Sequence, residues 1–506
     1  MGGGGGAGNI FLYMLIPVSI TALIIIIPMT DKMPYLIIFL VVIATAVKEV
    51  IIALFEYKLK CCYNSIGMTK IRTRFAPSPT GAMHIGNIRT GVYSYALARH
   101  FGGEFILRIE DTDKKRETPG GVESIKNLLK TLGLDWDEYY IQSERVDSGT
   151  YKTPALELIK QGHAFFCRCE AKNAKKEGFS KELRDPCRDK NYKEGAIKLK
   201  VPDSESISFR DFIVDKEIAW DTSTVADTTL LKSDGFPTYH LGVVVDDHQM
   251  NISHVIRGHD WLPSTPIHLL IYKYLGVERP EIGHATDILD PEGGKLSKRK
   301  GSVSVEGMLS EGYLPEALLN FVILLGWAPK DNRELFTLDE FVKAFDIKGF
   351  QKANPVFNRD KLDWFNGQYI RKLSIDELNA KFIVRSSSFK KLDKNKQLLI
   401  TKLLQDRIKK ISDFDDLAGF FFEEPKVDKG LLGKNYTKHL TATIEVLEKD
   451  IPLDQVPQKY DFKVGDFFMD LRIAVTGSKF TPPINESIAI LGKDETVKRI
   501  KKVLGL

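Results

Sequence analysis

Two short segments combine residue types that suit phosphate chemistry. The first, at residues 76–87, reads APSPTGAMHIGN and contains Pro77, Pro79, Gly81, His84 and Gly86. Proline fixes φ and removes an N–H donor, whereas glycine lets a ligand approach the backbone closely. Such a composition is typical of a surface turn. It equally predicts a loop that must keep one shape because a ligand lies against it.

The second segment, GGKLSKRKG at residues 293–301, is rich in cations. Its glycines flank Lys295, Lys298, Arg299 and Lys300, which surround Ser297. Alone, such a run is typical of a solvated basic loop. Together with a histidine-bearing loop ahead of a helix, it predicts a clamp on a triphosphate. A helix N-terminus, an imidazole N–H and ammonium groups all stabilise phosphate charge.

The elements that must position the first segment alternate between strand and helix. Residues 70–75 (KIRTRF) alternate polar and apolar side chains and predict a short strand. Residues 88–103 (IRTGVYSYALARHFGG) predict a helix that stops at its two glycines, and residues 104–113 (EFILRIEDTD) predict a strand ending in acids. This order predicts a doubly wound α/β domain, in which ligands bind at the carboxyl ends of the strands.

The pattern changes farther along the chain. A mixed, charge-rich segment at about 150–230 is interpreted as an insertion. The apolar run VVVDD at 243–247 then predicts a strand, and STPIHLLIYKYLG at 264–276 predicts a helix. Beyond about residue 370 the pattern is mostly helical, most clearly over LLITKLLQDRIKKI at 398–411.

Composition sets wider bounds on the function. A chain of 506 residues has room for roughly three domains of ~100–200 residues each. The net charge of +5 permits a polyanionic partner without requiring one. Five cysteines, two of them adjacent, argue against a disulfide scaffold and predict a reducing, cytoplasmic location.

The first 67 residues differ from the rest of the chain. A glycine run precedes two apolar stretches, at 10–29 and 33–47, and the second continues past Lys48 and Glu49 to residue 55. Their lengths predict a membrane hairpin, with attachment through residues 10–55. The alternative is a spurious upstream extension, because MTKIRTRF at Met68 resembles the natural start of a soluble enzyme. Both interpretations stay open at this point.

Many motifs, in order, resemble the glutamyl-tRNA synthetases, class I enzymes of the glutamyl/glutaminyl branch, in their bacterial and organellar form. HIGN at 84–87 and KLSKR at 295–299 look like the two class I signatures. The other matching segments are RFAPSPTG (74–81), RIEDTD (108–113), FPTYHL (236–241), VVDDH (244–248), VIRG (255–258), STPIHLLIY (264–272), EALLNFVILLGW (316–327), KLDWFNGQYI (361–370) and LRIAVTGSKFTPPINESIAILG (471–492). The resemblance covers about residues 70–506.

The resemblance implies an α/β fold with a class I Rossmann-like parallel-sheet catalytic domain, followed by a helical anticodon-binding domain. We expect the catalytic domain over residues 68–370 and the anticodon-binding domain over 371–506, after an N-terminal extension over 1–67. The catalytic part then includes an α+β acceptor-binding insertion at about 150–230 and a stem-contact region at about 290–370.

The implied activity is ATP-dependent ligation of L-glutamate to the 3′ end of tRNA(Glu) through a glutamyl-adenylate. Mg²⁺ accompanies the ATP because it neutralises the phosphates, and we expect a monomer. One alternative is an enzyme that also glutamylates tRNA(Gln). Two others are a small-molecule nucleotidylyltransferase and the truncated relative that modifies a tRNA base, but neither needs the helical carboxyl half. The last is a membrane protein built around residues 10–55.

Residue roles carry over from the same motifs. Those implied for catalysis are His84, Gly86, Lys295 and Lys298, and those for ATP are His84, Gly86, Asn87 and Lys298. Those implied for glutamate are Arg74, Ala76, Ser78, Glu110, Tyr239 and Arg257. Two positions depart from the pattern: Val243 stands where many relatives have asparagine, and His259 where many have an acid.

Three cysteines resemble the zinc-binding insertion of some relatives. They are Cys167, Cys169 and Cys187. A structural zinc takes four ligands, and the candidates for the fourth are Asp189 and Tyr192. The alternative is three free thiols in a reducing compartment.

Overall fold

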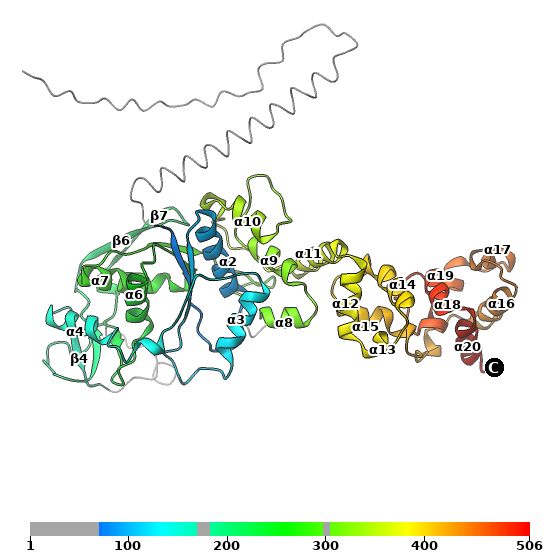
Figure 1. Ribbon diagram of the computed structural model, residues 1–506, viewed down its shortest axis with the longest axis horizontal. Helices are drawn as coiled ribbons and strands as arrows, with labels where there is room; N and C mark the ends of the chain where they lie inside the picture. Colours follow the sequence, from blue (N-terminus) through cyan, green and yellow to red (C-terminus); the bar gives the residue numbers. More distant parts are fainter. Residues whose placement is uncertain (1–69, 170–182, 297–303) are drawn as a thin grey trace, which may run out of the picture. The chain divides into compact units, whose positions relative to one another are not determined.

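The computed structural model describes residues 70–169, 183–296 and 304–506 (Figure 1). The chain divides into two units, Met1–Met68 and Thr69–Leu506. The apolar stretches within residues 10–55 lie outside the described residues, and so does Lys298. Among the residues that are described, no helix is both long and apolar enough to cross a membrane.

The first part of the described chain contains parallel β-strands. Strands β1 (Arg72–Phe75), β2 (Glu104–Ile109) and β3 (Glu138–Ile141) pair in parallel in the order β1-β2-β3. Strands β9 (His254–Gly258) and β10 (Glu281–Ala285) form a second parallel pair. The Ser253 N–H donates to the Arg72 carbonyl at 2.9 Å, so β9 begins beside β1. The predicted parallel α/β fold is confirmed.

Helix α2 (Ile85–His100) connects β1 to β2 and packs on both. It ends before Gly102, close to the predicted stop. Gly91 explains how closely the helix can lie on the strand, since a Cβ there would meet the Phe75 ring at 3.2 Å. Helix α3 (Gly121–Thr131) then leads to β3.

The run VVVDD is helical, so the prediction of a strand there was wrong. It lies within α6 (Tyr239–Gln249), where every residue from Leu241 to Asp247 is buried. A short apolar run buried on all sides shows no period, and periodicity cannot then separate strand from helix. The helix predicted at 264–276 is confirmed as α7 (Thr265–Leu275), which ends at Gly276 in the left-handed conformation.

The segment at about 150–230 is mostly antiparallel. After α4 (Lys152–Lys160), strands β4 (Ala164–Cys167), β5 (Ala196–Leu199) and β8 (Thr229–Leu231) form a sheet in that order. Strands β6 (Ser206–Asp211) and β7 (Lys216–Asp221) form a separate hairpin. Contacts between β6 and β10 join this hairpin to the parallel strands.

From residue 304 onward the described chain is helical (Figure 1, yellow-green to red). The helices are α8 (Val305–Ser310), α9 (Pro315–Ile323), α10 (Leu338–Ala344), α11 (Arg359–Lys372), α12 (Ile375–Arg385), α13 (Ser387–Lys390), α14 (Lys394–Gln405), α15 (Asp413–Ala418), α16 (Tyr436–Glu448), α17 (Val456–Lys459), α18 (Val464–Thr476), α19 (Ile484–Leu491) and α20 (Lys493–Leu504). Phe382, Phe414, Leu440 and Leu471 belong to one buried core among them. The predicted helical half is confirmed, although α14 ends at Gln405 rather than at residue 411.

Candidate active site

A cavity of about 940 Å³ lies where β1, β2, β9 and β10 end. Its lining includes Arg74, Ala76, Ser78, His84, Gly86, Asn87, Glu110, Tyr239, Arg257 and Lys295. These are all the predicted nucleotide and amino-acid residues that the structure describes. Residues from six separate stretches of the sequence therefore meet at one edge of the parallel strands, as the fold class predicts.

Backbone hydrogen bonds hold the proline loop that follows β1. The Pro77 carbonyl accepts from the Glu110 N–H at 3.0 Å, and the Pro79 carbonyl accepts from the Thr118 N–H at 2.9 Å. Gly121 permits this approach, because a Cβ there would lie 2.9 Å from the Pro79 oxygen. The two prolines lack donors, but their carbonyls fasten the loop to the segment after β2.

His84 is the N-cap of α2. Its backbone is extended (φ −78°, ψ 145°), and its Nδ1 accepts a hydrogen bond from the Gly86 N–H at 3.0 Å. A ring nitrogen that accepts carries no proton, so the neutral imidazole holds its hydrogen on Nε2. His84 is therefore a hydrogen-bond donor through Nε2 at the start of a helix, where anions are favoured.

A buried ionic network lies beneath Arg74. The Arg74 Nε lies 3.2 Å from Asp247 Oδ1, and the Arg108 Nη1 lies 2.7 Å from the same oxygen. The Arg108 Nη2 also lies 3.1 Å from Glu110 Oε1. Burial acts to raise the pKa of Asp247, but the two arginines hold that pKa below its ordinary value. Burial raises the pKa of Glu110, only partly opposed by Arg108 and Arg74.

Arg108 and Asp247 were missed as functional residues in the sequence. Both are almost fully buried and neither lines the cavity. The sequence did contain a signal for both residues, since the segments RIEDTD and VVDDH place charged side chains within apolar runs. A buried charge requires a partner, and here the partners come from β2 and α6.

The Arg257 guanidinium is held by four protein acceptors. Nε donates to His284 Nε2 at 3.0 Å, and Nη2 donates to Thr265 Oγ1 at 2.7 Å. Nη1 contacts His268 Nδ1 at 3.1 Å and donates to Tyr239 Oη at 3.3 Å. A guanidinium has only donors, so the facing nitrogens of both histidines are unprotonated acceptors. Burial lowers the pKa of each histidine, which keeps both neutral.

Asp211 fixes the ring of His284 from the other side. His284 Nδ1 lies 2.7 Å from Asp211 Oδ2, and both groups are buried. Since Nε2 accepts from Arg257, Nδ1 carries the hydrogen and donates it to the carboxylate. Asp211 ends β6, so a residue of the antiparallel hairpin supports an arginine of the cavity.

The two departures from the family pattern lie outside the cavity. Val243 is 3% exposed and packs in the apolar core with Leu241 and Val244. His259 is half-exposed, and its Nδ1 lies 3.8 Å from Asp287 Oδ2. Neither side chain therefore replaces a contact within the cavity.

Lys295 lies at the cavity between two acids. Its Nζ pairs with Asp260, and it lies 3.0 Å from Asp287 Oδ1. Burial acts to lower the pKa of Lys295, but the two carboxylates raise it above its ordinary value. The ammonium is therefore charged and close to the cavity.

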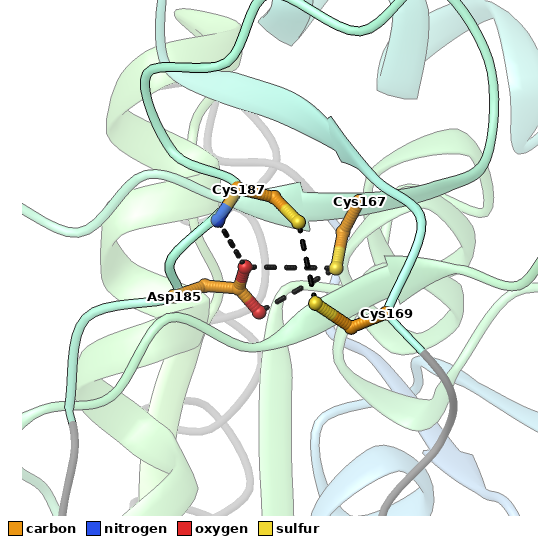
Figure 2. Close-up of side chains that lie close together, drawn as sticks. All are labelled: Cys167, Cys169, Asp185 and Cys187. Carbon is orange, nitrogen blue, oxygen red and sulfur yellow. Dashed lines mark hydrogen bonds between the residues drawn. The ribbon is translucent and has the colours of Figure 1, made fainter.

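A second cluster gathers Cys167, Cys169, Asp185 and Cys187 (Figure 2). One ligand atom from each lies within 4.8 Å of all the others, and the Cys169 and Cys187 sulfurs are 3.3 Å apart. Sulfurs bound to one tetrahedral zinc at ~2.3 Å lie ~3.8 Å apart, so this donor set fits the metal. Burial raises the pKa of the Cys167 thiol, and a zinc ion would oppose that shift.

Of the two predicted fourth ligands, Asp189 does not belong to this cluster, and Tyr192 packs against the buried group of Phe165, Cys167 and Cys187. Asp189 pairs with Lys200 at 3.1 Å, and the Arg168 guanidinium lies over the Tyr192 ring. Asp185 occupies the fourth position instead. Its Oδ1 accepts from the Cys187 N–H at 2.8 Å, and its Oδ2 lies 2.5 Å from Lys198 Nζ.

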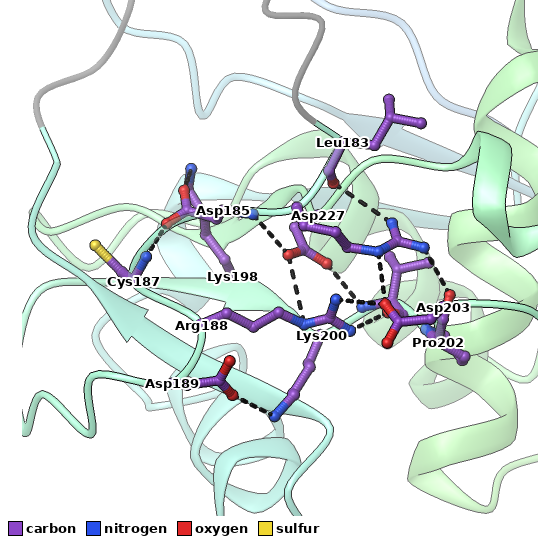
Figure 3. A network of polar contacts seen from close by, with 12 residues as sticks. Leu183, Asp185, Cys187, Arg188, Asp189, Lys198, Lys200, Pro202, Asp203 and Asp227 are labelled. Atoms are coloured by element: carbon purple, nitrogen blue, oxygen red, sulfur yellow. Dashed lines mark hydrogen bonds and ion pairs between the residues drawn. The ribbon is translucent and has the colours of Figure 1, made fainter.

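Ion pairs fasten the loop that carries Asp185 and Cys187 (Figure 3). The Asp185 N–H donates to Asp227 at 3.0 Å, and the Arg188 guanidinium lies 2.9 Å from Asp203. The Val201 N–H donates to Asp227 as well, at 2.9 Å. These contacts tie the loop to the segment that follows β5 and to the segment that precedes β8.

Comparisons with known proteins agree with this architecture. The family model of tRNA synthetases class I (E and Q), catalytic domain, matches residues 70–364. The family model of an anticodon binding domain matches residues 351–504. The fold and the cavity are thus those of a class I tRNA synthetase.

Among individual relatives, a glutamate–tRNA ligase of Dehalococcoides mccartyi is 39% identical over 474 residues, 85% of this chain and 97% of that protein. One from Treponema denticola is 37% identical over 505 residues, 86% of this chain and 99% of that protein. The crystal structure of a glutamate tRNA ligase from Elizabethkingia meningosepticum, in complex with its amino acid, superposes with a TM-score of 0.71 at 32% identity, covering 86% of this chain and 99% of that one. The chain belongs to the glutamate–tRNA ligase family, and the resemblance stated from its motifs is confirmed.

Proposed function

We propose that this chain joins L-glutamate to the 3′ end of tRNA(Glu) in two steps. The glutamate α-carboxylate attacks the α-phosphate of ATP, forming glutamyl-adenylate and releasing pyrophosphate. A ribose hydroxyl of the terminal adenosine of tRNA then attacks the carbonyl carbon of the adenylate and releases AMP. The observation that supports this proposal is the single cavity lined by both sets of predicted residues.

The arginine side of the cavity suits a dicarboxylic amino acid. Arg74 and Arg257 provide fixed guanidinium groups, and guanidinium pairs strongly with carboxylate. Glu110 provides an acceptor for the substrate ammonium, with Tyr239, Ala76 and Ser78 completing the wall. A neutral glutamine side chain lacks the second carboxylate and does not pair with an arginine in the same way.

The histidine side suits the phosphates of ATP with its Mg²⁺. His84 donates through Nε2, and Gly86 and Asn87 bring the first turn of α2 close to the nucleotide. Lys295 adds a positive charge, and we assign the same role to Lys298 from its motif. Both steps need only positioning and stabilisation of charge on phosphate oxygens, with no enzyme nucleophile.

We assign adenylate formation to residues 68–370, with acceptor binding in the insertion at about 150–230 and stem contacts at about 290–370. Residues 371–506 bind the anticodon region of tRNA. The protein acts in the cytoplasm as a monomer. Cell fractionation with sequencing of the mature N-terminus tests the location, since a start at Met68 removes the membrane hairpin.

Charging assays test the proposal directly. The full chain is incubated with ATP, Mg²⁺, radiolabelled glutamate and either tRNA(Glu) or tRNA(Gln). We expect glutamyl-tRNA(Glu), and the tRNA(Gln) reaction measures whether the enzyme discriminates. If neither tRNA is charged by a folded protein, the proposed function is wrong.

We further infer that Cys167, Cys169, Asp185 and Cys187 hold a structural zinc. Three thiolates and a carboxylate carry four negative charges, and Lys198 offsets part of the excess over Zn²⁺. Zinc analysis of the chelator-washed full chain is expected to find one equivalent, lost in Asp185→Ala and retained in the control Asp189→Ala. Absence of zinc from the washed wild-type protein would contradict the inference.

A further inference from the structure

The HIGN motif at residues 84–87 and the residue before it are joined to residues 304–306, which come after the KLSKR motif at residues 295–299. The Met83 N–H, one residue before His84, lies 3.1 Å from Glu306 Oε1 and 3.0 Å from Oε2, so it donates to both carboxylate oxygens. The Met83 carbonyl accepts from the Val305 N–H at 2.9 Å. His84 itself pairs with Ser304 in an antiparallel bridge.

Residues 304–306 thus hold both polar groups of the Met83 backbone. The Met83 side chain is 4% exposed, and Val305 and Met308 are fully buried. Ser304 caps α8 by accepting from the Gly307 N–H, which fixes the direction in which the helix begins. The junction therefore combines hydrogen bonds with buried apolar side chains.

The consequence for His84 follows from its position in the chain. His84 is the N-cap of α2, so the plane of the preceding peptide decides where its imidazole lies. The Met83 N–H belongs to the peptide between Ala82 and Met83, and the Met83 carbonyl belongs to the peptide between Met83 and His84. Removing the acceptor of the Met83 N–H frees the Ala82–Met83 peptide to rotate, which leaves the Val305 N–H as the one of these two anchors before His84. A displacement of ~1 Å at a catalytic group can cost ~10²-fold in rate.

We propose that Glu306 is a positioning residue for adenylate formation, acting on His84 through the Ala82–Met83 peptide and the Met83 backbone. This rests on the proposed function, in which His84 donates to a phosphate oxygen. Glu306 does not line the cavity. Its role is to keep the Nε2–H of His84 in place while the amino-acid side of the cavity is untouched.

The test is ATP–pyrophosphate exchange by the full chain in the presence of tRNA(Glu), with kcat and the KM values for ATP and glutamate measured separately. In Glu306→Ala we expect kcat to fall ~10- to 100-fold with the glutamate KM unchanged. Glu306→Gln keeps an oxygen that accepts from the Met83 N–H, so we expect it to recover most of that loss. Glu316→Ala is the matched control, because Glu316 is also an acid in the first turn of a helix and lies outside the cavity.

A double-mutant cycle separates positioning from general destabilisation. If Glu306 acts through His84, Glu306→Ala has little further effect on kcat in a His84→Ala background. Three results would each overturn the inference. The effects of the two substitutions on kcat could be fully additive in the cycle, or Glu306→Ala could keep the wild-type kcat. The third is a loss of kcat in Glu306→Gln equal to that in Glu306→Ala. Absence of exchange by the folded wild-type chain would instead contradict the proposed function.

Discussion

The two sides of the cavity are built differently. The side that we assign to glutamate, here called the glutamate wall (Arg74, Glu110, Tyr239, Arg257), rests on buried charges, since Asp247 pairs with two arginines and Arg257 has four acceptors. The side that we assign to ATP, here called the nucleotide wall (His84, Gly86, Asn87, Lys295), rests on backbone hydrogen bonds around a helix start. On this side the Lys295 side chain is 46% exposed.

This difference between the two walls matches the two ligands that we propose, glutamate and ATP. Glutamate is small and its carboxylates must be distinguished from an amide, which requires guanidinium groups fixed in a desolvated environment. A triphosphate carries more charge and more freedom, and a helix N-terminus with accessible donors serves it well. Substitutions on the glutamate wall should therefore change the KM for glutamate, and substitutions on the nucleotide wall should change kcat.

The largest effect is expected from Arg74→Ala. It removes a cation of the glutamate wall and leaves Asp247 with Arg108 alone. Truncating one partner of a buried charge pair costs up to ~5 kcal/mol, so kcat/KM for glutamate should fall by ~10³-fold or more. Pyrophosphate exchange measures this, with Arg74→Lys and circular dichroism as controls. Near-normal adenylate formation in a folded Arg74→Ala protein would remove Arg74 from the glutamate wall.

His84→Ala is expected to have the next largest effect. It deletes the Nε2–H donor and the acceptor that the Gly86 N–H uses. Loss of one donor that stabilises developing charge costs ~3–4 kcal/mol, or ~10²- to 10³-fold in kcat. The KM for glutamate should stay near the wild-type value. If His84→Ala changed only the KM for glutamate, the two walls would not act separately on glutamate binding and on kcat.

Thr265→Val probes the support of Arg257 without touching the cavity lining. Valine matches threonine in shape but leaves the Arg257 Nη2–H without its acceptor at 2.7 Å. An unsatisfied buried donor costs ~1–3 kcal/mol, so we expect the glutamate KM to rise ~10-fold with the ATP KM unchanged. Thr265→Ser keeps the hydroxyl and is the matched control. If Thr265→Val and Thr265→Ser had equal KM values for glutamate, the Thr265 hydroxyl would not position Arg257.

The sequence predicted residues that line both walls, but it missed the buried residues that support the glutamate wall. His84 and Gly86 belong to a local signature, and local turns and helix caps depend on neighbours in the chain. Asp211 contacts His284, 73 residues away, and Asp247 contacts Arg74, 173 residues away, so only the tertiary fold reveals their partners. Asp185 was missed because only the fold brings it to Cys167 and Cys169. The run at 243–247 was assigned to a strand for another reason, since burial on all sides leaves no hydrophobic period.

The smallest effect concerns the acid sensitivity of the glutamate wall. His240 Nδ1 lies 3.2 Å from His268 Nε2, and burial, with Arg257 nearby, lowers the pKa of His240 to about 4. In the unfolded chain the histidine pKa is about 6.5, so between these values the unfolded state binds more protons.

The contribution of His240 is therefore complete above pH 6.5 and is lost as the pH falls toward 4, by at most ~1.4 kcal/mol per pH unit. Urea midpoints of the full chain at pH 7 and pH 5 measure the loss. His240→Gln keeps an acceptor for His268 but does not titrate, so its midpoint should fall less than that of the wild type. An equal fall in both proteins would assign the acid sensitivity to groups elsewhere, and the glutamate wall would then not depend on a neutral His240.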